Sequence, residues 1–237
     1  AATVEAALAG SGKGNVHHAQ AACLSITQST ELGLVYRPDE IEGLSKLCRA
    51  HGVKLHMDGA RFANAVVGTG ASPAELTWKS GVDILSFGAT KNGAMAAEAI
   101  VVFDETLAES LAFRRKRAGQ LFSKGRFLGV QIAAYLENGH WLDLARHANA
   151  AATKLAAVFE AAPGARVAGP VEANEVFAWL TDTADRAMKS AGAAYYPWAG
   201  DPGLGTPGRA GETLHRFATS FATSEADIDG IATALGA

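Results

Sequence analysis

The chain has 237 residues, of which 49% are hydrophobic and 19% are charged. This length and composition are typical of a globular protein with one or two domains. The formal net charge is −3 with acids and bases interspersed, which argues against a nucleic-acid partner because no broad cationic surface is available. No run approaches the roughly 18 to 20 apolar residues of a membrane span, and the first residues do not resemble a signal peptide. We therefore expect a soluble protein that is not exported.

The cysteines and histidines give no pattern of a disulfide framework or a metal centre. Cys23 and Cys48 lie in a strand-like and a helix-like segment and show no CxxC spacing. The His17-His18 pair and the pair formed by His56 and Asp58 lack a third ligand at a supporting spacing, so we expect structural or surface roles for them and no metal. This cysteine usage fits a reducing cytoplasm, which is the compartment we predict.

The first part of the chain alternates short apolar runs with longer amphipathic ones. We predict strands at 23–28, 53–58, 82–88 and 99–103, and helices at 39–52, 61–70 and 74–81. In the first of these helices, Ile41, Leu44 and Cys48 recur at helical spacing between Pro38 and Gly52, which mark its start and stop. Strands that alternate with helices usually run parallel and are joined by right-handed crossovers. The sequence therefore predicts an α/β fold with a mostly parallel sheet.

After Asp104 the pattern changes to long helices and then to a smaller mixed unit. We predict helices at 105–120, 126–139, 140–162, 184–192 and 225–237, and strands at 165–169, 174–181, 194–198 and 214–220. The stretch 199–211 carries Gly and Pro at turn density and is expected to be a mobile loop between two strands. We place a large domain at residues 1–142 and a small α+β domain at residues 143–237, with the boundary near residues 138–148.

Two further motifs favour structural explanations. The stretch AGSGKGN, residues 9–15, lacks the spacing of a phosphate-binding loop and follows a helical pattern, so we interpret it as a helix end and a turn. The basic run at residues 114–117 is short and helical, and the simplest interpretation is a solvated helix face. The alternative for this run is an anion site that extends across a subunit boundary.

An acid and a lysine stand at the ends of neighbouring predicted strands. Asp58 lies where strand 53–58 meets the next turn, and Lys91 follows strand 82–88 within the small-residue stretch SFGATKNGAM. In an open α/β sheet, ligands gather at the carboxyl ends of the strands. A buried lysine has a lowered pKa, and its neutral amine can attack an aldehyde such as that of pyridoxal phosphate, whose ring nitrogen needs a carboxylate beside it. The alternative is a structural ion pair between Asp58 and Lys91.

Four stretches carry a resemblance to a known family: LHMDGARFANA, SFGATKNGAMAAEAIVVF, RRKRAGQ and VEANEVF. Together they resemble the bacterial low-specificity L-threonine aldolases, of the aromatic amino acid beta-eliminating lyase/threonine aldolase family. The resemblance runs from about residue 5 to the C-terminus. It implies a partial large domain of the fold type I pyridoxal-phosphate enzymes, with a mostly parallel sheet, followed by the small C-terminal domain.

The same resemblance assigns roles to five residues. Lys91 matches the lysine that forms a Schiff base with the cofactor, and Asp58 matches the partner of its pyridine nitrogen. Arg61 matches the arginine near the phenolic oxygen of the cofactor, and Thr90 adjoins the lysine in the cofactor pocket. Arg216 matches the small-domain arginine that holds the substrate α-carboxylate, for which a guanidinium fork is well shaped.

The implied activity is cleavage of L-threonine, L-allo-threonine and related β-hydroxy-α-amino acids to glycine and an aldehyde. Members of the family carry a preceding segment with a glycine-rich turn for the cofactor phosphate and a histidine that stacks on the ring, and neither has a counterpart in this sequence. Because of this missing segment, a non-catalytic fragment or remnant that cannot hold the cofactor stays open as an alternative. A β-eliminating lyase or racemase that uses the same cofactor also stays open, because only the family resemblance selects aldol cleavage. The family also implies a homodimer or homotetramer, with helices 104–139 and the N-terminal residues as candidate contacts.

Overall fold

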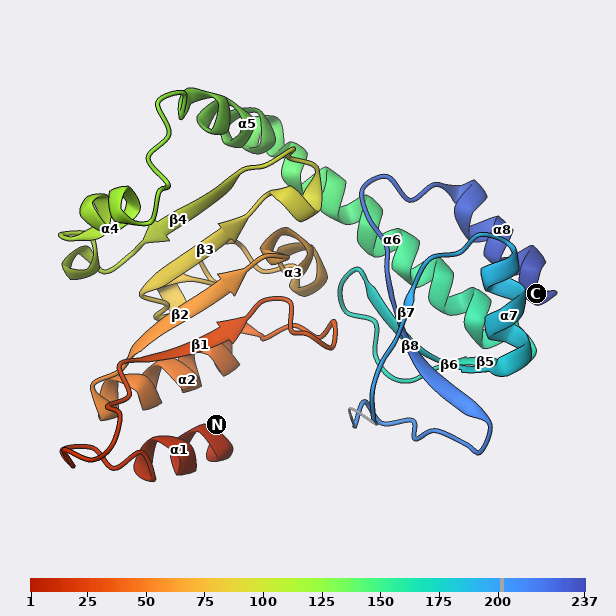
Figure 1. The fold of residues 1–237 in the computed structure, drawn as a ribbon, viewed down its shortest axis with the longest axis horizontal. Helices are drawn as coiled ribbons and strands as arrows, with labels where there is room; N and C mark the ends of the chain where they lie inside the picture. The colour runs from red at the N-terminus through yellow and green to blue at the C-terminus, as the bar shows by residue number, and fades with distance from the viewer. Residues whose placement is uncertain (201–202) are drawn as a thin grey trace. The chain divides into compact units, whose positions relative to one another are not determined.

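A computed structural model describes residues 1–200 and 203–237, and this part of the chain contains two four-stranded sheets (Figure 1). Contacts between residues divide the chain into two units, each with one of the sheets. Unit 1 comprises residues 1–28, 36–62 and 69–138, and unit 2 comprises residues 29–35, 63–68 and 139–237. Two short segments from the first third of the chain therefore belong with its C-terminal part.

The sheet of unit 1 has the strand order β1-β2-β3-β4. The strands are β1 (Cys23–Thr27), β2 (Lys54–Gly59), β3 (Ile84–Gly88) and β4 (Glu98–Val102). The first three run parallel, which confirms the predicted α/β arrangement, whereas β4 is antiparallel to β3. The reversal has a simple cause: residues 89–97 are too few for the dozen-residue crossover that a further parallel strand requires.

Helix α2 (Pro38–His51) shows most clearly why the sequence folds as it does. Pro38 occupies the first turn, and the side chain of Glu40 accepts a hydrogen bond of 2.8 Å from the Arg37 backbone N–H. Gly52 ends the helix at φ 72°, in the left-handed region that suits glycine. Ile41, Leu44 and Cys48 are buried, and α2 packs against β2. The other α-helices between residues 1 and 138 are α1 (Ala2–Ala9), α3 (Phe62–Thr69), α4 (Leu111–Arg117) and α5 (Arg126–Leu136).

Two predicted helices of unit 1 are wrong in extent. The segment 74–81 forms turns and only a short 3-10 helix, η1 (Trp78–Ser80), because Gly81 at φ 88° ends it at once. The segment 105–120 is interrupted. Asp104 caps the short 3-10 helix η3 (Glu105–Leu107) by accepting a hydrogen bond from the Thr106 N–H, and α4 starts only at Leu111. Apolar spacing does not reveal such local turns, because they depend on side-chain caps.

Unit 2 is an antiparallel sheet in the order β5-β6-β8-β7, with helices packed against it. Its elements are α6 (His140–Ala161), β5 (Ala165–Val167), β6 (Glu175–Thr181), α7 (Asp182–Ser190), β7 (Tyr196–Pro197), β8 (Glu212–Ala218) and α8 (Glu225–Leu235). A core of buried residues joins α6, α7 and α8 to β6 and β8. Phe159 of α6 is fully buried there and packs against Phe217 of β8, with the rings tilted by 52° and their centroids 4.7 Å apart. A second, smaller cluster lies around Trp179 and Leu214.

The Gly- and Pro-rich stretch 199–211 joins β7 to β8, as predicted, although residues 201–202 lie outside the described residues. Part of it is tied down by hydrogen bonds. The Trp179 indole donates to the Thr206 carbonyl at 2.8 Å, and the Thr206 N–H donates to the Ala168 carbonyl at 3.0 Å. The expectation of a mobile loop therefore does not hold around Thr206.

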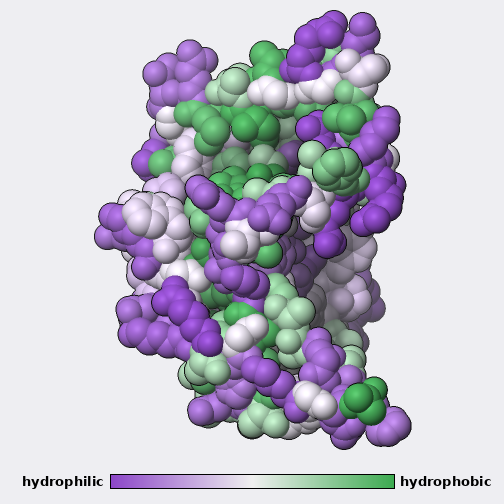
Figure 2. Space-filling model, turned by 90° about the vertical axis from the view of Figure 1, so that its left-hand side faces the viewer, coloured by the Kyte–Doolittle hydropathy of each residue, from purple (hydrophilic) through white to green (hydrophobic). Residues whose placement is uncertain are grey.

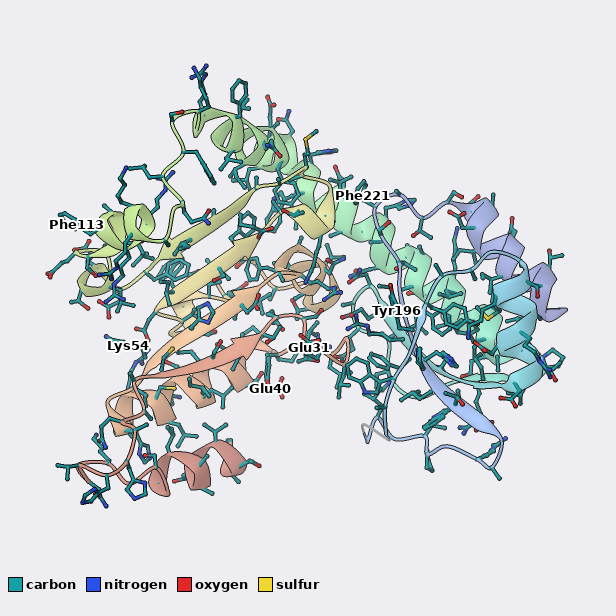
Figure 3. All side chains as sticks on the ribbon, in the orientation of Figure 1. Glu31, Glu40, Lys54, Phe113, Tyr196 and Phe221 are labelled. Carbon is teal, nitrogen blue, oxygen red and sulfur yellow. The ribbon has the colours of Figure 1, made fainter. Side chains whose placement is uncertain are left out.

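Unit 1 also exposes large apolar side chains. Figure 2 views this unit from the side of α4 and shows hydrophobic side chains gathered in the upper part of the face. Phe113, 78% exposed, lies on α4 at the outer edge of the unit (Figure 3). The other large exposed apolar residues between β4 and α5 are Ile100, Val101, Leu121, Phe122, Phe127, Val130 and Leu136. Among the described residues, no helix is long and apolar enough to cross a membrane.

Candidate functional site

Asp58 and Lys91 lie at the same edge of the sheet in unit 1, as the sequence predicts. Asp58 is near the end of β2 and pairs in register with Ser86 of β3. Lys91 lies in η2 (Thr90–Asn92), which follows the end of β3 at Gly88. Because β2 and β3 are parallel neighbours, both residues stand at the carboxyl ends of their strands, where α/β sheets bind ligands.

The turns that follow these two strands pack directly on each other. A Cβ atom on Gly88 would lie only 2.7 Å from the Cα of Ala60, so any larger residue would push the turns apart. The Ala60 N–H in turn donates to Oδ1 of Asp58 at 3.0 Å, which fixes the half-buried carboxylate at the strand end. Arg61 follows, half-buried, directly before α3. The glycine therefore brings the two predicted functional turns into contact.

Lys91 itself is exposed, and the expectation of a buried, desolvated amine is wrong for this chain. Its neighbours Thr90 and Gly93 are exposed as well, because the part of unit 1 that the structure describes does not cover this turn. Within the described residues neither Asp58 nor Lys91 forms an ion pair, which contradicts the structural ion-pair alternative. The amine is thus accessible and not neutralised by a partner.

Residues of α5 form hydrogen bonds with the turn that carries Lys91, a contact that the sequence does not predict. The Asn92 amide donates to the Tyr135 hydroxyl at 2.6 Å, and both side chains are buried. Burial raises the pKa of Tyr135 to about 12, so the hydroxyl stays protonated. Oε1 of Gln131 accepts hydrogen bonds from the N–H groups of Met95 and Ala96, at 3.0 and 3.1 Å. A lone tyrosine and glutamine within an apolar helix were the available signals.

Arg216 belongs to unit 2, where it pairs in register with Phe177 of β6. Its guanidinium lies 3.6 Å from a carboxylate oxygen of Glu175 and 3.7 Å from one of Glu31. The same group lies over the Trp198 ring, 5.4 Å from the ring centroid. The sequence indicates Arg216 but not these partners; the signal for Glu175 is a charged residue at the start of the apolar strand EVFAWLT.

The motifs that were set aside have structural explanations. Residues 9–15 cover the end of α1 and the turns after it. His56 bridges neighbouring strands: its ring nitrogens lie 2.7 Å from the Ser25 hydroxyl and 2.9 Å from the Ser86 hydroxyl. His17-His18 is exposed, and the described residues hold no cluster of three metal-ligating side chains. The basic run 114–117 is exposed on α4, and both Cys23 and Cys48 are free.

Comparisons with known proteins point in one direction. A family model described as beta-eliminating lyase matches residues 1–183. Low specificity L-threonine aldolases of a Pseudomonas species and of Pseudomonas aeruginosa are 43% and 46% identical to the chain, over 92% and 80% of its length. A solved structure of Leishmania major threonine aldolase, 28% identical, has a TM-score of 0.87 over 99% of this chain and 66% of its own.

The chain spans 60% and 55% of the two Pseudomonas relatives, respectively, so it corresponds to part of their length. The family model covers well over half of the chain, and the architecture of unit 1 agrees with the fold of the solved relative. The chain therefore belongs to the beta-eliminating lyase family.

Proposed function

We propose that the chain takes part in pyridoxal-phosphate-dependent cleavage of L-threonine, L-allo-threonine and related β-hydroxy-α-amino acids to glycine and an aldehyde. The observation that carries this proposal is the placement of Asp58 and Lys91 at the carboxyl ends of two adjacent parallel strands. The identity of 43–46% to L-threonine aldolases supports the choice of aldol cleavage over elimination or racemisation. In this proposal residues 1–142 form the cofactor-binding portion and residues 143–237 form the small domain. The two units differ from this division, because residues 29–35 and 63–68 belong with unit 2.

The residues of unit 1 fit pyridoxal phosphate by their chemistry. Lys91 offers an exposed amine for the aldehyde of the cofactor. Asp58, fixed by the Ala60 N–H, offers a carboxylate on the neighbouring strand for the pyridine nitrogen. Thr90 and Arg61 lie beside these residues in sequence and complete the proposed cofactor contacts. The close approach of Gly88 to Ala60 keeps the acid-bearing and amine-bearing turns together.

Each residue has a defined task in the proposed reaction. Bound cofactor supplies an electron sink for the bond that breaks between Cα and Cβ. Asp58 would hold a proton on the ring nitrogen, which keeps that sink effective. Arg216 would bind the α-carboxylate of the amino acid through its guanidinium fork and so determine which bond of Cα is oriented for cleavage. Lys91 would hold the cofactor between turnovers.

Acetaldehyde release from L-threonine tests the proposal. The chain supplied with pyridoxal phosphate should release acetaldehyde and glycine, and Lys91→Ala should abolish the release. Lys124→Ala, which alters another exposed lysine of unit 1, is the matched control and should behave like the unaltered chain. Borohydride treatment should fix the cofactor covalently on Lys91. No product and no trapped cofactor would instead identify a non-catalytic remnant.

We further propose that a second copy of the chain covers the exposed apolar residues between β4 and α5, which gives a homodimer or homotetramer. Eight large apolar side chains are exposed in this short part of unit 1, more than isolated surface residues explain. Light scattering should show an oligomer, and Phe113→Ser with Phe127→Ser should reduce it to smaller species. The amino acid substrate and the free thiols Cys23 and Cys48 are compatible with work in the cytoplasm.

A further inference from the structure

Arg216 stands between two carboxylates that differ strongly in their access to water. The side chain of Glu175 is 0% exposed, whereas that of Glu31 is 68% exposed and that of Arg216 is 29% exposed. All three belong to unit 2. A buried carboxylate is costly unless a cation accompanies it, while an exposed ion pair contributes little. Glu175 therefore depends on the nearby Arg216 cation, whereas the contact between Arg216 and Glu31 contributes little to stability.

The position of Glu175 follows from strand register. Glu175 pairs with Ala218 and Phe177 pairs with Arg216, so Glu175 is the diagonal neighbour of Arg216 on one face of the sheet. The Arg216 guanidinium also lies over the Trp198 ring. That ring packs edge to face against the Phe177 ring, with the two ring centroids 5.2 Å apart. The carboxylate and the aromatic ring thus both lie next to the Arg216 guanidinium.

The loop 29–35 contacts Glu175 through Gly33 and also carries Glu31, which is labelled in Figure 3. Gly33 is buried at φ 73°, and a Cβ there would lie 2.9 Å from the Cβ of Glu175, so only glycine allows this close approach. The loop is anchored to unit 2 at Val35, whose N–H donates to the carboxylate of Glu172 at 2.8 Å. The loop therefore shields Glu175 from water, whereas Glu31 on the same loop is exposed.

We infer that Glu175 is a positioning residue that fixes the Arg216 guanidinium, and that Glu31 is an exchangeable partner whose place the α-carboxylate of an amino acid substrate takes. This inference rests on the proposed role of Arg216 in substrate binding. The exposed Glu31 contact is easily broken, whereas a substrate carboxylate forms a bidentate, charge-assisted pair. The buried Glu175 contact persists in both states and keeps the fork oriented.

The positioning role is tested without substrate or cofactor. In a proton–nitrogen correlation spectrum of the whole chain, the Arg216 Nε–H signal is assigned by its loss in Arg216→Lys. Glu175→Gln should shift and broaden this signal, because the guanidinium is released. Glu212→Gln is the matched control: it breaks the ion pair with Arg166 in the same sheet, away from Arg216, and should leave the signal in place. An unmoved signal in Glu175→Gln would overturn the positioning role.

The exchange role is tested by kinetics with L-threonine. Glu31→Gln removes the competing anion and should lower KM about threefold, with kcat unchanged. Glu175→Gln should raise KM about tenfold with kcat changed by less than about threefold, since a released arginine must be ordered again when substrate binds. A KM in Glu31→Gln that equals or exceeds that of the unaltered chain would refute the exchange. If no variant cleaves L-threonine, the proposed function fails, while the spectrum still decides whether Glu175 holds Arg216.

Discussion

The two units place their candidate functional residues in opposite settings. In unit 1 the amine of Lys91 is exposed on a turn, and the neighbouring carboxylate of Asp58 is held by one backbone N–H. In unit 2 the guanidinium of Arg216 lies beside a buried carboxylate and over an aromatic ring that packs against the cluster around Trp179 and Leu214. The residue proposed to recognise substrate is therefore fixed by its own unit, whereas the residue proposed to react is left accessible.

The largest expected contrast between the units lies in their apolar side chains. Phe159→Ala empties the core of unit 2 and should lower the free energy of unfolding by about 3 to 5 kcal/mol. Phe113→Ala removes a ring that is 78% exposed on α4 of the single chain and should change the free energy of unfolding of the dissociated chain by less than about 0.5 kcal/mol. Urea unfolding of both variants, at protein concentrations low enough to dissociate any oligomer, measures the difference. Equal losses under these conditions would show that Phe113 is packed within the single chain.

The ion pair of Arg216 should give the next largest effect. Arg216→Leu removes the cation that lies 3.6 Å from the buried carboxylate of Glu175 and should cost about 2 to 3 kcal/mol, somewhat less than the loss of a fully buried pair because the arginine is partly exposed. Adding Glu175→Gln should recover at least half of this loss. A double-mutant cycle from urea unfolding measures the coupling, and strictly additive losses would show that the two side chains do not interact.

A smaller effect is expected where unit 1 supports the lysine turn. Tyr135→Phe removes the hydroxyl that accepts the hydrogen bond of Asn92 and should cost about 1 kcal/mol. The amides of residues 92–96 should then exchange faster with solvent, and those of β6 should not. Tyr36→Phe, at a tyrosine outside this turn, is the control. Unchanged exchange would mean that the Gln131 contacts suffice to hold the turn.

Unit 2 should also lose some stability on acidification because of His215, and we expect this to be the smallest of the effects. Burial lowers the pKa of His215 from its ordinary value of 6.5, an effect that the neighbouring Asp185 only partly offsets. The unfolded chain binds a proton more readily, so this contribution is complete above pH 6.5 and declines as the pH falls through the lowered pKa. Melting temperatures between pH 7.5 and pH 5 should fall less in His215→Gln. A parallel fall in both proteins would assign the loss to other groups.

The sequence predicts the elements of both units well where apolar spacing is strong. Strands β1, β2, β3, β6 and β8 and helices α2, α5, α6 and α8 lie where expected, because their buried faces repeat with the period of the element. The failures at 74–81 and 105–120 arise from local caps and turns around residues such as Asp104 and Gly81. Apolar periodicity contains no information about these features.

The candidate site was predictable only in part. Asp58 and Lys91 could be placed at one sheet edge because both end apolar strands, but the exposure of Lys91 depends on which segments cover the turn. The partners of Arg216 come from residues 31, 175 and 198, and no spacing in the sequence connects them. Such contacts between distant residues become visible only in the folded chain.

The assignment of residues 29–35 and 63–68 to unit 2 limits how this protein can be dissected. A gene fragment that starts at Gly139 would encode every strand of the second sheet yet omit the loop that shields Glu175 and the helical segment that buries Ala65 beside Val35 and Ala173. In such a fragment the buried carboxylate of Glu175 would be exposed to water. Recombination or protein engineering that exchanges the C-terminal part of the chain must therefore exchange residues 29–35 and 63–68 together with it.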